Sequence, residues 1–122
     1  MKTNNYFLVF IGGGLGALLR YLFALALEIT FDPATANSLS LYVVNILGAL
    51  ILGLTNIFES EKHRLLWGAG FAGGFTTMSG VAIFIYTQSP VAVIPSIAIM
   101  FGLGFIAYAA GSNLARVLKG NK

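Results

Sequence analysis

Long apolar segments alternate with short polar ones along this chain, and the pattern predicts four membrane-spanning helices. The apolar segments cover Asn5–Ile29, Leu39–Phe58, Leu65–Tyr86 and Val91–Val117. A helix of about 20 residues, rising about 1.5 Å per residue, crosses a hydrocarbon core of about 30 Å, and each segment reaches that length. Polar connectors join the segments, at Thr30–Ser38, Glu59–Arg64 and Thr87–Pro90. The pattern therefore predicts an all-α membrane protein.

The third apolar segment contains a stretch that opposes a regular helix. Between Gly70 and Gly80 it holds four glycines and three hydroxyl side chains. A glycine in a helix interior costs about 1 kcal/mol relative to alanine, and Ser and Thr offer the backbone alternative hydrogen bonds. Within a bilayer, non-helical backbone is tolerated only where protein buries it or water reaches it. We expect a helix broken near its middle, with freed backbone groups facing something polar; the alternative is a glycine face for close helix packing.

The first segment carries a charged residue on a face of glycines. Gly12, Gly16 and Arg20 are spaced by four residues and therefore share one helix face. The spacing of the two glycines lets another helix approach closely. Because a charge facing lipid is costly, we expect Arg20 to point at protein or at a wet cavity. An arginine that snorkels to the membrane surface is the alternative.

The second segment repeats this design with an amide. Asn45, Ala49 and Gly53 again follow one another at intervals of four residues. The Asn45 side chain thus lies on a face of small residues that packs against another helix. There it either bonds to a neighbouring helix or donates to an anion.

The composition supports a membrane protein and excludes several other classes. The chain of 122 residues is 57% hydrophobic and 9% charged, with a mean hydropathy of +0.86, whereas soluble domains carry about 25% charged residues. We expect residues 1–122 to form one domain. Cysteine is absent, His63 is the single histidine, and no carboxylate lies deep within a span. Thiolate and histidine metal sites, a proton relay and an enzyme are therefore not expected, and the basic residues form no stripe for nucleic acid.

The basic residues are distributed unevenly between the two membrane sides. With four spans, both termini and the Glu59–Arg64 connector share one side, and the other two connectors share the opposite side. The first side holds six basic residues and the second none; the six are Lys2, Lys62, Arg64, Arg116, Lys119 and Lys122. Basic residues in short loops are retained in the cytoplasm. The bias predicts cytoplasmic termini and a single fixed orientation.

Three stretches, in order, resemble motifs of the Fluc/CrcB family of bacterial fluoride channels. They are Gly12–Tyr21 (GGGLGALLRY), Val44–Gly48 (VNILG) with Gly53 after it, and Gly70–Ser79 (GFAGGFTTMS). Chain length, number of spans and connector lengths are similar as well. The resemblance covers the whole sequence.

The resemblance implies an antiparallel dimer of the dual-topology type in the bacterial cytoplasmic membrane. It implies two fluoride pores, with the Asn45 amide and the Thr77 and Ser79 hydroxyls as donors to the ion. It also implies a structural sodium ion at the dimer interface, held by the backbone carbonyls of Gly73 and Thr76. Such an assignment suits the residues, because a hard cation prefers oxygen ligands.

The sequence departs from the family pattern at its pore-lining aromatic positions. Where the family has two phenylalanines, this chain has Met78 and Val81, and Gly80 replaces the threonine between them. We therefore expect one subunit of a passive channel that exports fluoride, paired with a paralogous subunit of opposite orientation that supplies the aromatic groups. The alternatives are a structural or regulatory subunit without a pore, and a small proton-coupled multidrug exporter. An exporter of that kind needs a carboxylate in the first span, and none precedes Glu28.

Overall fold

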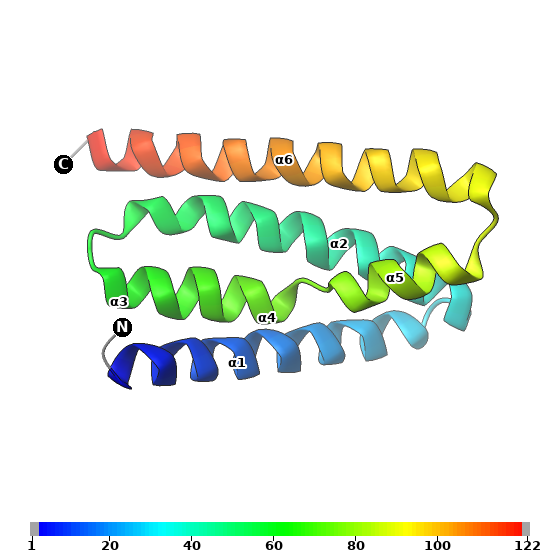
Figure 1. Ribbon diagram of the computed structural model, residues 1–122, viewed down its shortest axis with the longest axis horizontal. Helices are drawn as coiled ribbons and strands as arrows, with labels where there is room; N and C mark the ends of the chain where they lie inside the picture. Colours follow the sequence, from blue (N-terminus) through cyan, green and yellow to red (C-terminus); the bar gives the residue numbers. More distant parts are fainter. Residues whose placement is uncertain (1–2, 121–122) are drawn as a thin grey trace.

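Four long helical rods lie side by side in the computed structural model, which describes residues 3–120 (Figure 1). The first rod is α1 (Thr3–Glu28), and the second is α2 (Pro33–Leu54) with the 3₁₀ turn η1 (Thr55–Ile57) at its end. The third rod consists of four pieces in sequence, α3 (Glu61–Arg64), η2 (Leu65–Ala72), α4 (Gly73–Phe75) and α5 (Met78–Thr87). The fourth is α6 (Pro90–Gly120). The described residues contain no strand, and the predicted all-α fold with four spans is confirmed.

Three connectors are shorter in the structure than the sequence predicts. Helix α2 begins at Pro33 rather than Leu39, because Asp32 caps it by accepting from the Ala34 and Thr35 amides, both at 3.1 Å. Hydrogen bonds from Thr35 also hold the pKa of Asp32 below its usual value. Residues 61–64, assigned to a connector, form α3, and α6 begins at Pro90.

Glycines bring the four rods together in two pairs. On α1, a side chain at Gly12 or Gly16 would collide with the backbone of η2, since these glycines meet the Leu66 and Phe71 carbonyls. On the other side, Gly53 of α2 meets the Tyr108 carbonyl of α6 in the same way. Helix α1 thus packs on the third rod, and α2 packs on α6. The predicted close approach at the Gly12–Gly16 spacing is confirmed.

The third rod is broken at Thr76 and Thr77. Both residues have extended backbone, with ψ of 161° at Thr76 and φ, ψ of −143°, 118° at Thr77, and helix resumes at Met78. Upstream of this break, η2 is a π-helix, a geometry that in proteins often accompanies functional sites. The predicted helix break is confirmed, and the alternative of glycine packing also holds in part, because Gly74 fits against the backbone of Gly13.

A small apolar core lies beside the break. Leu41 of α2, Val81 of α5 and Met100 of α6 are buried and contact one another, and Tyr42 and Phe84 pack against their edge. Tyr42 also donates its hydroxyl to the Ser96 carbonyl on α6 at 3.2 Å. These contacts hold the half of the third rod that follows the break against α2 and α6.

Two neighbouring glycines of α1 provide a test of this packing. At Gly16 a new methyl group would meet the Phe75 amide nitrogen at 2.7 Å, whereas at Gly14 it would meet nothing within 4 Å. We expect Gly16→Ala to lower the free energy of unfolding by about 1–3 kcal/mol through overpacking. Gly14→Ala should be neutral or stabilising by up to about 1 kcal/mol. Thermal unfolding of the purified protein in detergent measures both, and equal effects would contradict the packing.

Candidate functional site

Side chains from two other helices bind the extended residues of the break. Arg20 of α1 donates from Nη1 to the Thr76 carbonyl at 2.7 Å. Asn45 of α2 makes a reciprocal pair with Thr77: its Oδ1 accepts from the Thr77 amide at 2.8 Å, and its Nδ2 donates to the Thr77 carbonyl at 3.3 Å. The Thr76 carbonyl and both backbone groups of Thr77 therefore have partners from α1 and α2, as a bilayer requires.

The break leaves the Gly73 carbonyl without its helical partner. In a continuous helix the Thr77 amide would donate to the Gly73 carbonyl, but here it donates to Asn45. The Gly73 carbonyl receives only a long contact from the Thr76 hydroxyl, at 3.4 Å. Gly73 is also exposed, and a Cβ there would meet nothing within 4 Å. An oxygen acceptor at mid-span therefore faces the surface of the chain.

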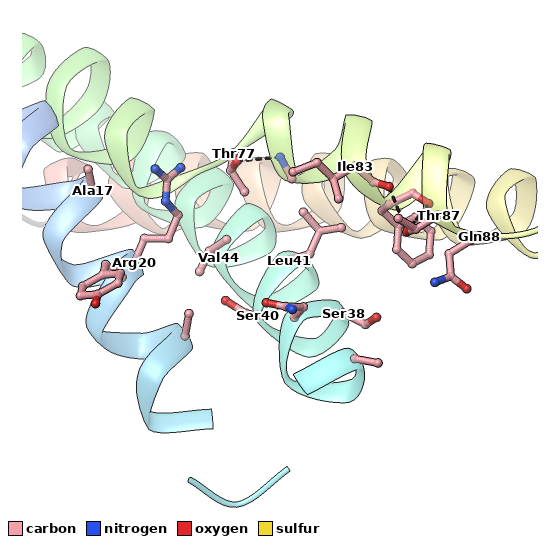
Figure 2. Close-up of a pocket in the computed structure, with 16 residues that line it drawn as sticks. Ala17, Arg20, Ser38, Ser40, Leu41, Val44, Thr77, Ile83, Thr87 and Gln88 are labelled. Carbon is pink, nitrogen blue, oxygen red and sulfur yellow. Dashed lines mark hydrogen bonds between the residues drawn. The ribbon is translucent and has the colours of Figure 1, made fainter. Parts of the chain in front are cut away.

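The hydroxyls that follow the break are arranged as donors. The Gly80 amide donates to Thr77 Oγ1 at 3.0 Å (Figure 2). This oxygen also lies 3.1 Å from Ser79 Oγ. One hydroxyl hydrogen lies between the two oxygens, and the hydrogen of the other hydroxyl is free to be donated. The pair can therefore offer a neutral O–H to a small anion or to water.

A cavity of about 610 Å³ begins at the break and runs between α1, α2 and α5 toward the end of the bundle opposite the termini (Figures 1 and 2). Arg20 and Thr77 lie at its inner end, and Thr87 and Gln88 lie at its outer end (Figure 2). Among residues 3–120, Arg20 is the only charged side chain that lines it. A cavity with one fixed positive charge and otherwise uncharged, largely apolar walls attracts anions. The expectation that Arg20 points at protein is thus confirmed, since its guanidinium binds Thr76 and lines the cavity.

The residues predicted for the site fall into three environments. Arg20, Asn45, Thr76 and Thr77 meet at the break, and Ser79 touches Thr77 through its hydroxyl. At the two positions where the resemblance expects phenylalanine, Met78 is 69% exposed and Val81 is 3% exposed. Neither residue lines the cavity, and Asn45 lies outside it too.

Several polar residues of the cavity were missing from the sequence prediction. They are Asn37, Ser38, Ser40, Thr87 and Gln88. The first two were assigned to a connector, although Asp32 followed by Pro33 is the usual signal of a helix start and would have placed them on a helix. Thr87 and Gln88 were assigned to a connector as well, and Ser40 gave no signal, because serine is an ordinary residue in any span.

Comparison with known proteins agrees with this geometry. The model of the family described as "CrcB-like protein, Camphor Resistance (CrcB)" matches residues 7–112. The chain belongs to the CrcB family. A CrcB relative in Corynebacterium jeikeium, named fluoride-specific ion channel FluC 2, is 34% identical over 91% of this chain and 79% of its own length. Another, from Sulfurihydrogenibium sp. and named fluoride-specific ion channel FluC, is 33% identical over 94% of this chain and 99% of its own length.

The CrcB match includes every residue of the break and both residues that bind it, Arg20 and Asn45. The resemblance proposed from three motifs is therefore confirmed. Membership of this channel family also confirms the expectation that the chain is not an enzyme.

Two changes at Asn45 test whether the break depends on its amide. Asn45→Ala removes both bonds to Thr77, and we expect the free energy of unfolding to fall by about 1–3 kcal/mol for each backbone group left unpaired. Asn45→Asp retains an acceptor for the Thr77 amide and should cost less. Asn56→Ala is the control, because it removes an exposed amide that bonds to Ser112. Unfolding followed in detergent micelles measures all three, and equal losses at positions 45 and 56 would contradict the role of Asn45.

Proposed function

We propose that this CrcB-family chain is a subunit of a passive, fluoride-selective ion channel. The observation that carries the proposal is the break in the third rod, where Arg20 and Asn45 hold two peptide groups and leave the Thr77 hydroxyl able to donate. The names of the relatives supply the ion, since they are called fluoride-specific ion channels.

Fluoride demands a particular kind of site. The ion is small and holds its hydration shell tightly, so a pore has to replace water with other hydrogen-bond donors. The Thr77 and Ser79 hydroxyls and the Asn45 amide are neutral donors of this kind. Arg20 supplies the positive potential that draws an anion into the cavity, and its bond to Thr76 keeps that charge at a fixed place.

We propose further that the conducting form contains a paralogous subunit of opposite orientation. Neither Met78 nor Val81 provides an aromatic ring, so the partner would provide the rings. Both ends of the described chain and α3 lie at one end of the bundle (Figure 1). Lys62, Arg64 and Lys119 lie there, while Lys2 and Lys122 fall outside the described residues. From this bias we propose that the termini lie in the cytoplasm of a bacterium and that fluoride leaves the cell down its gradient.

A sodium ion at the subunit interface is part of the proposal. The Gly73 carbonyl suits a hard cation, because it is an oxygen ligand with a single long contact on an exposed surface. The Thr76 carbonyl is a weaker candidate, since the Arg20 guanidinium already binds it at 2.7 Å and would repel a second cation. Gly73 of this chain would therefore hold the ion more strongly than Thr76, with the remaining ligands from the partner.

A pair of glycine variants tests the interface and its ion. Within this chain a Cβ meets nothing within 4 Å at Gly73 or at Gly102, so a difference in assembly between valine variants at these two positions would point to contacts outside the chain. We expect Gly73→Val to abolish assembly and its dependence on sodium, while Thr76→Ser and the control Gly102→Val leave assembly intact. Chromatography in sodium and in a large organic cation measures the assembled fraction. A fully assembled Gly73→Val protein would contradict the site.

Fluoride efflux from liposomes tests the channel itself. We expect a fluoride electrode to record efflux when this chain is reconstituted with its paralogous partner, and none when it is reconstituted alone. Efflux from this chain alone would contradict the need for a partner. No efflux in either preparation, with well-assembled protein, would contradict the channel and favour a structural or regulatory subunit.

A further inference from the structure

The Asn45 amide has one donor that its pairing with Thr77 does not use. A side-chain amide carries two hydrogens on its nitrogen, and one of them is donated to the Thr77 carbonyl at 3.3 Å. The same Nδ2 lies 3.6 Å from Sδ of Met100 on α6. A thioether sulfur is a weak acceptor. The second hydrogen of Asn45 is therefore covered by a group that binds it poorly.

Met100 closes the space in front of this donor. It is 6% exposed, and it packs with Leu41 and Val81 in the core beside the break. The buried methionine thus covers the Asn45 amide on the side that faces α6.

We propose that Met100 controls the access of fluoride to Asn45, an inference that rests on the proposed channel function. In the chain without an ion, the thioether covers the second amide hydrogen. When fluoride arrives, the Met100 side chain turns aside and the ion accepts that hydrogen in its place. Met100 is thus a specificity-determining residue, since the space that it vacates limits the size of the ion.

The chemistry of methionine suits such a movable cover. Its side chain is unbranched, with three rotatable bonds, and it adapts to irregular spaces without a movement of the backbone. An anion competes well against a thioether for an N–H donor, because hydrogen bonds to charged acceptors are about twice as strong as neutral ones. The pairing of Asn45 with Thr77 remains in place during this exchange, so the break keeps its geometry.

Two variants of Met100 separate this role from simple packing. Met100→Ala removes the cover, and we expect fluoride flux in the conducting assembly to rise by about two- to tenfold, the range set by one hydrogen bond. The preference for fluoride over chloride should fall, because the path is wider. Met100→Leu keeps the volume with a branched, stiffer side chain, and flux should fall several-fold. Liposome efflux of each anion from monodisperse protein measures these changes.

The control is Val93→Ala, which shortens another buried residue of α6 about two turns from Met100. It should leave the fluoride preference unchanged and should not raise the flux. If the wild-type assembly conducts but Met100→Ala lowers flux as Val93→Ala does, the inference about Met100 is wrong and the channel stands. If Met100→Ala does not assemble, Met100→Leu decides, since unchanged flux would overturn the inference. A wild-type assembly without flux contradicts the proposed function instead.

Discussion

The requirement that backbone polar groups find partners inside a bilayer governs this structure. A helix satisfies the requirement through its own hydrogen bonds, but the backbone of the third rod is extended at Thr76 and Thr77. Partners then have to come from other helices, and they must approach closely. Gly12 and Gly16 bring α1 against η2, so that Arg20 on the same face reaches the Thr76 carbonyl. Asn45 on α2 reaches Thr77 from another side. The glycines and the two polar side chains thus act together to provide hydrogen-bond partners for the backbone at the break.

The same arrangement produces groups that can serve an anion. The positive charge that binds Thr76 also lies at the inner end of the cavity, where it is the only charge among the described lining residues. The Thr77 hydroxyl that caps α5 accepts from Gly80, and together with the Ser79 hydroxyl it has one hydrogen left to donate. The same residues therefore stabilise the break and provide the groups that can bind an anion. Asn45, for example, uses one donor and one acceptor of its amide to bind Thr77, and the remaining donor is available to an ion.

Sequence reasoning reached the fold because the bilayer constrains it strongly. Apolar length predicts spans, and glycines with hydroxyls inside a span predict a break; both were found. The face shared by Gly12, Gly16 and Arg20 followed from helical periodicity alone. The start of α2 was misplaced because a polar run was given more weight than the capping signal of Asp32 and Pro33. The pairing of Asn45 with Thr77 and its contact with Met100 were beyond reach, because they join residues 32 and 55 positions apart, and spacing within one helix does not specify such contacts.

The backbone conformation of Thr76 and Thr77 in a lipid bilayer is the most direct test of this account. Solid-state NMR of the isotope-labelled chain in its lipid-reconstituted assembly reports it through the Cα and Cβ chemical shifts. The account predicts extended shifts at both threonines, helical shifts at Phe75 and Val81, and a Thr77 amide protected from hydrogen exchange by Asn45. Helical shifts at both threonines would show an unbroken third rod, and that result would contradict the account.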